Sequence, residues 1–316
     1  MWRRFGWPGL VRVHTATGGG CQGGWRSGRP SRIDTFNVRA RGGRLLPGDK
    51  EVQLTDLPMV KGGRAERLKA AGIDTVAKLA NADLAALAAH PAFGRDDGFL
   101  GQLPILQGFA QAHDRGEPIV YAADERLFST KEPILHLDLE FDGPACEIFL
   151  WGFLEHRSQR IEQWFDHSKR GQQEMLDRFR QRVKDEDPTI VTWGGRTSDV
   201  VQIRRACERY EVPTNWIAKA RWLDLQQDVV YTGNAETQRV YLPVRNFSSD
   251  TVAKYFGYEK PRLAVKDGFQ ALRLYQAYKR HPREGIRRDL CEYNAEDIKH
   301  TRLILEGLRR LMEPVR

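Results

Sequence analysis

Residues 134–141 read ILHLDLEF, in which polar side chains fall at every second position. A period of two predicts a β-strand, on which Asp138 and Glu140 point to one face while the leucines and Phe141 point to the other. Two carboxylates on one face of a central strand repel each other and are costly to desolvate unless a cation neutralises them. The pair therefore indicates a divalent metal site, although a DxE on the solvated face of an edge strand is also common.

The residues around this strand alternate between short apolar runs and stretches with helical spacing. Two strands follow closely enough to pair as antiparallel neighbours, and helix and strand then alternate. This order predicts an α/β fold in which a mixed sheet is flanked by helices. We expect the strands at 147–155, 160–166, 189–193 and 222–225, and the helices at 171–183, 199–210, 251–256, 269–278 and 285–311.

Two later segments place acidic residues on predicted helices. In TIVTWGGRTSD a strand and a Gly-Gly turn lead into a helix that opens near Asp199. An acid at a helix start also suits the helix dipole, which requires no further role for it. In CEYNAEDIKH, Tyr293 and Asp297 are four residues apart and therefore share one helix face. His300 follows Asp297 by three residues and is close enough to approach the site, but the expected position of its ring is in solvent.

Taken in this order, the segments resemble the DEDD superfamily of 3′–5′ exonucleases, in its tyrosine-containing subgroup. The resemblance covers about Lys131–Met312 and extends to the YprB-type RNase H-like domain, which implies an RNase H-like mixed five-stranded sheet flanked by helices. At the second motif, where that family reads YNGxxFD, this chain reads WGGRTSD. The resemblance places Asp138 and Glu140 on the first exonuclease motif, Asp199 on the second, and Tyr293 and Asp297 on the third.

Four carboxylates offer only oxygen ligands, which suit hard cations such as Mg²⁺ or Mn²⁺. The resemblance implies a metal-dependent 3′–5′ exonuclease in which two ions clamp the attacking and leaving oxygens at phosphorus. The expected substrate is the 3′ end of single-stranded DNA or RNA. The alternative is a non-catalytic nucleic-acid-binding or scaffold protein with a degenerate RNase H-like domain. In the catalytic hypothesis Asp138 bridges both ions, Glu140 and Asp297 each complete one, Asp199 holds one partly through water, and Tyr293 orients the attacking water.

The chain is expected to consist of three parts. Residues 1–44 are rich in arginine and glycine and lack apolar periodicity, which predicts a disordered leader. Residues 45–116 predict a small all-α domain with a connector. Its segment LTDLPMVKGGRAERL resembles a helix-hairpin-helix, a module that presents backbone N–H groups to nucleic-acid phosphates. Met59 and Lys61 replace the two usual glycines of that module, and a purely structural helical domain is the alternative. Residues 117–316 form the predicted exonuclease domain.

Composition excludes several other classes of protein. The net charge of +8 belongs to residues 1–44, which hold nine arginines and one acid, so the neutral remainder gives no sign of a basic nucleic-acid face. The longest apolar run, Ile148–Leu154, is far shorter than the ~20 residues that span a bilayer, and no membrane span is expected. The four cysteines form no CxxC pair, which argues against a structural zinc site and a disulfide framework. A cytoplasmic location is therefore expected.

Overall fold

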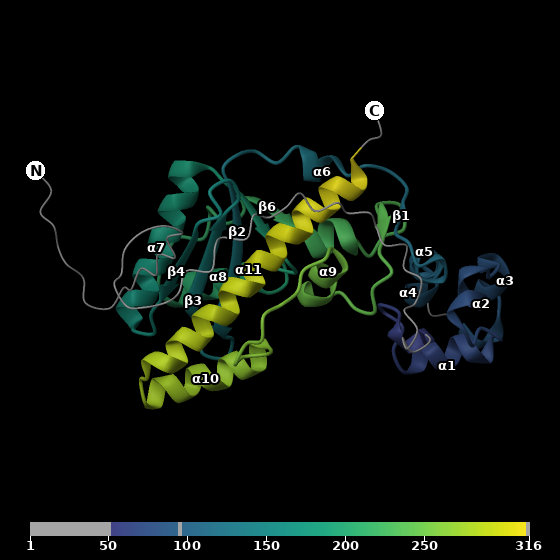
Figure 1. Ribbon diagram of the computed structural model, residues 1–316, viewed down its shortest axis with the longest axis horizontal. Coiled ribbons are helices and arrows are strands. Elements are labelled where there is room, and N and C mark those ends of the chain that lie inside the picture. The colour runs from purple at the N-terminus through teal and green to yellow at the C-terminus, as the bar shows by residue number, and fades with distance from the viewer. Residues whose placement is uncertain (1–51, 94–96, 314–316) are drawn as a thin grey trace, which may run out of the picture. The chain divides into compact units, whose positions relative to one another are not determined.

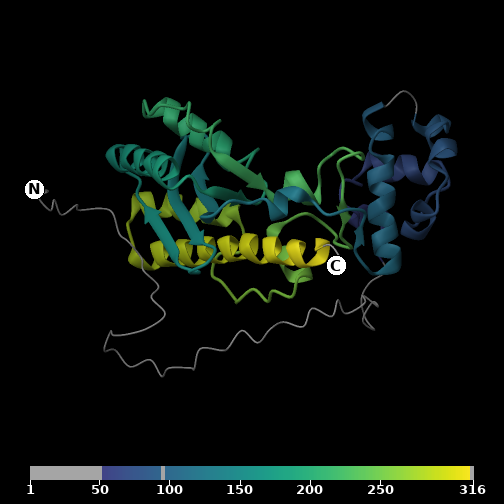
Figure 2. The same cartoon turned by 90° about the horizontal axis from the view of Figure 1, so that it is seen from above.

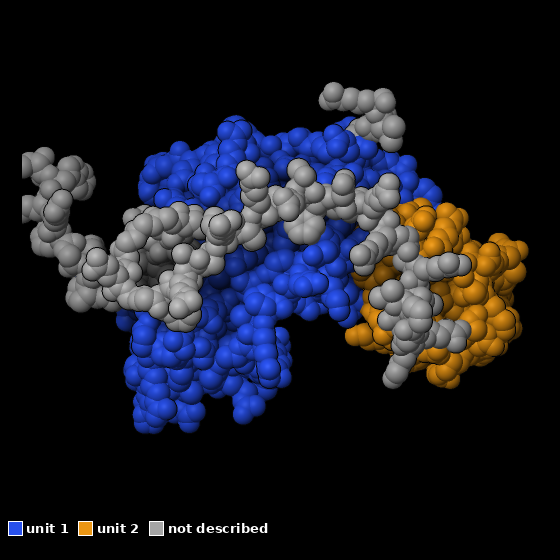
Figure 3. Space-filling model, in the orientation of Figure 1, with its two compact units in different colours: residues 1–14, 120–240, 246–316 blue, residues 15–119, 241–245 orange. Residues whose placement is uncertain are grey.

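The computed structural model describes residues 52–93 and 97–313. No helix in this described part of the chain is long and apolar enough to cross a membrane. Within it, the chain divides into two compact units (Figure 3). The larger unit comprises residues 120–240 and 246–313, and the smaller comprises residues 52–119 together with 241–245.

The smaller unit is built from short helices around a core that includes Leu57, Leu68 and Phe99. Two of these helices begin at side-chain caps: the Thr75 hydroxyl accepts the N–H of Lys78 at the start of α2, and the Asp83 carboxylate accepts the N–H groups of Ala85 and Ala86 at the start of α3. The predicted leader, residues 1–44, lies outside the described residues. The elements are η1 (Leu54–Asp56), α1 (Gly63–Ala70), α2 (Val76–Ala80), α3 (Leu84–Ala88), η2 (Pro91–Phe93), α4 (Asp97–Leu100) and α5 (Leu103–Arg115). Two further short strands, β1 (Ile119–Val120) and β7 (Val240–Tyr241), pair with each other.

The segment that resembles a helix-hairpin-helix contains a tight turn between η1 and α1. Met59 and Gly62 adopt positive φ angles of 70° and 47° in this turn, and the Arg64 guanidinium donates to the Met59 carbonyl at 3.1 Å. The element before the turn is a single 3₁₀ turn, shorter than the first helix expected of the module. The helix-hairpin-helix assignment stays a prediction.

The larger unit contains a five-stranded sheet in the order β4-β3-β2-β5-β6 (Figure 1). The central strand β2 pairs antiparallel with β3 and parallel with β5, so the sheet is mixed as predicted. Every predicted strand is present, with its ends shifted by at most one residue. The strands are β2 (Ile134–Asp142), β3 (Glu147–Glu155), β4 (Ile161–Phe165), β5 (Thr189–Thr192) and β6 (Arg221–Asp224).

Helices cover both faces of this sheet (Figure 2), which confirms the predicted fold class. On one face, the odd-numbered leucines of β2 pack with Met175, Phe179 and Ile203 in one apolar cluster. Helix α11 packs on β2 and β3 at the other face. Sequence periodicity missed α6 and η3, which are too short to show a period. The helices are α6 (Glu125–Phe128), α7 (Lys169–Glu186), α8 (Asp199–Arg209), η3 (Leu225–Val230, a π-helical turn), α9 (Ser249–Tyr255), α10 (Gly268–Arg280) and α11 (Glu284–Met312).

Candidate metal centre

Three acidic side chains meet between the central strand and helix α11. Asp138 and Glu140 lie on the face of β2 opposite its leucines, and Asp297 projects from α11. One ligand oxygen from each of the three lies within 4.8 Å of the other two. Glu140 is buried, whereas Asp138 and Asp297 are half-buried. Because the donor set is entirely carboxylate, it fits a hard divalent cation such as Mg²⁺ or Mn²⁺.

The electrostatics of this cluster call for a cation. Burial raises the pKa of Asp138 well above its usual range, and repulsion from Glu140, Asp297 and Asp199 adds to the effect. The pKa of Glu140 is raised in the same way, first by burial and then by Asp297 and Asp199. Buried carboxylates of like charge are disfavoured in their ionised form unless an opposite charge is present. A divalent ion bound here would supply that charge.

Asp199, the fourth predicted ligand, lies outside this triangle. It is the first residue of α8 and is buried. Burial raises the pKa of its carboxyl to about 8, with a hydrogen bond from Ser198 acting in the opposite direction. Its charge contributes to the raised pKa of Asp138, so it belongs to the same region of the unit. The structure thus brings three of the four predicted carboxylates together and leaves the fourth beside them.

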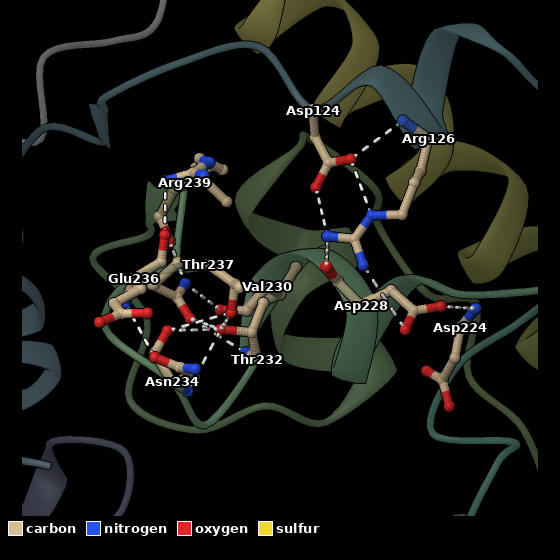
Figure 4. A network of polar contacts seen from close by, with 12 residues as sticks. Asp124, Arg126, Asp224, Asp228, Val230, Thr232, Asn234, Glu236, Thr237 and Arg239 are labelled. Atoms are coloured by element: carbon tan, nitrogen blue, oxygen red, sulfur yellow. Dashed lines mark hydrogen bonds and ion pairs between the residues drawn. The ribbon is translucent and has the colours of Figure 1, made fainter. Parts of the chain in front are cut away.

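The turn that carries Asp199 is held by a buried carboxylate on the neighbouring strand. Asp224, at the end of β6, accepts the backbone N–H groups of Gly194 at 2.8 Å and Arg196 at 2.9 Å. The Arg196 side chain pairs with Asp228 at 2.8 Å. Figure 4 shows Asp228 between Asp224 and Arg126, at one end of a wider polar network. These hydrogen bonds and ion pairs hold the loop before Asp199 through residues that lie far from it in the sequence.

Tyr293 lies on α11 one turn before Asp297, as the four-residue spacing predicts. The side chain is buried. Burial raises the pKa of its phenol far above the usual value, and the nearby charges of Asp297 and Glu140, together with a hydrogen bond to Asp297, add to this effect. A phenol is protonated near neutral pH, and in that form it can hydrogen-bond to a water molecule.

Lys260 was not identified from the sequence, and His300 was expected in solvent, but both lie at the site. The Lys260 ammonium lies 3.3 Å from Asp297 Oδ1 and 5.2 Å from the centre of the Tyr293 ring. Lys260 belongs to the connection between α9 and α10, where no periodic pattern marks it. His300, expected in solvent, is fully buried, and its Nδ1 lies 3.4 Å from Asp297 Oδ1. Burial lowers the pKa of His300, so its ring is neutral at pH 7. The expectation failed because α11 is covered on this side by Tyr258.

A family model described as RNase_H superfamily matches residues 135–309, more than half of the chain. The chain belongs to the RNase H superfamily. No curated protein and no solved structure matches it. The matched residues span all five strands of the sheet from the second residue of β2 onward, together with most of α11, and include every member of the carboxylate triangle. RNase H superfamily domains are generally nucleases that use divalent metals, and the carboxylate triangle lies within the matched residues.

Proposed function

We propose that this RNase H superfamily protein is a metal-dependent 3′–5′ exonuclease of the tyrosine-containing DEDD type. The observation that carries the proposal is the triangle of Asp138, Glu140 and Asp297, with the protonated Tyr293 phenol beside it. The proposed substrate is the 3′ end of single-stranded DNA or RNA. The all-oxygen donor set supports Mg²⁺ or Mn²⁺ as the resident ions.

Each side chain has a distinct part in the proposed mechanism. Asp138 would hold both ions, Glu140 and Asp297 would each complete the coordination of one, and Asp199 would contribute partly through water. When bound, divalent ions would supply Lewis-acid stabilisation of the charge that develops on oxygen as water displaces the leaving group at phosphorus. Tyr293 would orient the nucleophilic water by hydrogen bonding, since a phenol, with an ordinary pKa of about 10, is poorly matched to act as a base near neutral pH.

A labelled-oligonucleotide assay tests the proposal. Single-stranded DNA and RNA carrying a 5′ or a 3′ label are incubated with the purified protein and Mn²⁺, and the products are sized. We expect stepwise shortening from the 3′ end, reduced at least ~100-fold in Asp138→Asn and Asp297→Asn, because loss of a metal ligand costs more than loss of a supporting group. Asp142→Asn, a buried carboxyl of the same strand that lies outside the triangle, is the matched control. Full activity in both ligand variants would refute the assignment.

The position of Asp199 supports one alternative function. Asp199 stands apart from the other three carboxylates, so the site has one fewer close ligand than the resemblance implies. If the site held no metal, the domain would be a non-catalytic nucleic-acid-binding or scaffold protein. Mn²⁺ binding discriminates between the two. A nuclease site raises the melting temperature with Mn²⁺ and loses that gain in Asp138→Asn, whereas a scaffold shows neither effect.

A further inference from the structure

A row of three residues crosses the sheet beneath α11 and leads to the metal centre. Asp138 of β2 is the register partner of Gly152 of β3, and Gly152 is in turn the partner of Gln163 of β4. Partners in adjacent strands point to the same face. The row therefore begins at a predicted metal ligand, passes a position without a side chain, and ends at a buried amide.

Asn294 of α11 bridges the gap that Gly152 leaves. Its Nδ2 donates to Asp138 Oδ2 at 2.8 Å and also to the Asp138 carbonyl at 3.2 Å. Its Oδ1 accepts a hydrogen bond from Gln163 Nε2 at 2.9 Å. Gln163 Nε2 also donates to the Cys291 carbonyl at 2.8 Å, one helical turn earlier on α11. Both ends of the Asn294 amide are thus engaged, and the side chain is fully buried.

This arrangement requires glycine at position 152. A Cβ atom added there would lie 2.0 Å from Asn294 Oδ1 and 2.3 Å from the Ile298 side chain. Either distance is far below van der Waals contact, so a larger residue would displace the Asn294 amide and the Ile298 side chain from their present positions. The close approach of helix and sheet is what allows an asparagine, with its short side chain, to reach both Asp138 and Gln163.

The hydrogen bond has a consequence for metal binding. The terminal torsion of an aspartate is broad, so a half-buried carboxylate is not held by its rotamer alone. Asn294 fixes one oxygen of Asp138, and it does so with a neutral donor that brings no charge to compete with an ion. The carboxylate keeps its remaining lone pairs for coordination. Supporting contacts of this kind typically change metal affinity by about 10–100-fold when removed.

We propose that Asn294 is a positioning residue that presents Asp138 to the metal ions, and that Gln163 acts through Asn294. This inference rests on the proposed metal-dependent function. The side-chain amides of Asn294 and Gln163 would set the orientation of the Asp138 carboxylate toward the ions. The alternative is that the amides serve only to pack α11 on the sheet, in which case their loss would lower stability without a specific effect on metal affinity.

Calorimetric titration of the folded, metal-free protein with Mn²⁺ tests the inference. Asn294→Leu keeps the side-chain shape and removes the donor, and we expect ~10–100-fold weaker binding. Gln163→Leu should weaken binding less and in the same direction. Gln172→Leu is the matched control, because Gln172 is an equally buried glutamine that bonds to the backbone of Ile148 and Asp166, away from Asp138. Circular dichroism verifies that each variant is folded, and Gln172→Leu should bind Mn²⁺ as the wild type does.

A double-mutant cycle shows whether Gln163 affects Mn²⁺ affinity through Asn294 or independently of it. If Gln163 acts through Asn294, then Gln163→Leu has no further effect on Mn²⁺ affinity in the Asn294→Leu background. Additive losses, or wild-type affinity in Asn294→Leu, overturn the inference even when the wild type degrades oligonucleotides. A wild type that binds Mn²⁺ but cleaves nothing refutes the exonuclease proposal, and the Mn²⁺ titrations still decide the role of Asn294. Should a variant not fold, Asn294→Ser, which keeps a shorter donor, replaces Asn294→Leu and is expected to bind Mn²⁺ more weakly than the wild type.

Discussion

Replacing Asp199 by asparagine should make the metal-free protein less sensitive to alkaline pH. Burial raises the pKa of this carboxyl to about 8 in the folded protein, against about 3.9 in an unfolded chain. Because the folded pKa is the higher of the two, the stability that this group contributes is fully present below about pH 4. It is lost progressively as the pH rises through about 8. The difference in pKa corresponds to as much as about 6 kcal/mol of unfolding free energy above pH 8.

Urea unfolding at pH 5 and pH 8.5, with EDTA present, measures this contribution. Tryptophan fluorescence reports on the α/β unit, because Trp151 and Trp164 lie in its core. The wild type should lose stability between the two pH values, and Asp199→Asn should lose several kcal/mol less. Asp185→Asn, which removes an exposed carboxyl on α7, should behave as the wild type does. An identical pH dependence in Asp199→Asn and the wild type would refute the argument that Asp199 is a buried acid.

Three other substitutions test separate features of the site. Lys260→Met should tighten Mn²⁺ binding about fivefold, since the ammonium 3.3 Å from a ligand carboxylate competes with the ion; unchanged or weaker binding in calorimetry would contradict this. Tyr293→Phe should leave Mn²⁺ affinity unchanged and reduce turnover by up to ~100-fold, because it removes only the orientation of water; a parallel loss of metal binding would disprove that role. Gly152→Ala should destabilise the protein by about 1–3 kcal/mol in thermal unfolding, since the new Cβ meets Asn294. Gly285→Ala on α11, where a Cβ meets nothing within 4 Å, should not destabilise it.

Local periodicity was sufficient to predict the parts of this site that lie within single elements. The period of two placed Asp138 and Glu140 on one face of β2, and the observed apolar cluster occupies the other face. The four-residue spacing placed Tyr293 and Asp297 on one side of α11. Periodicity does not say which face of which helix packs on which strand, however. The meeting of Asp297 with the β2 acids was predicted through the family resemblance alone.

The site residues that could not be predicted from the sequence are those whose partners lie far away along the chain. Lys260 reaches the site from a connection without periodicity, and its partner is 37 residues away. Asn294 stands next to Tyr293 in the sequence, where nothing distinguishes it from any other polar helix residue until β2 and β4 are placed beneath it. Gln163 is a polar residue of an edge strand, for which exposure to solvent is the ordinary expectation. In the folded unit it is buried under α11.

The geometry of the metal centre therefore depends on where α11 packs on the sheet as much as on the carboxylates. Asn294 and Asp297 are three residues apart on this helix, so they share a face, and their separation along the helix axis is fixed by helical geometry at about 4.5 Å. A rotation of α11 by one residue would turn both away from Asp138 by about 100°. Asn294 and Ile298 pack over Gly152, the one position in the row Asp138, Gly152, Gln163 that lacks a side chain. A side chain at position 152 would therefore disturb Asn294, the residue of α11 that holds Asp138, although β3 itself carries no ligand.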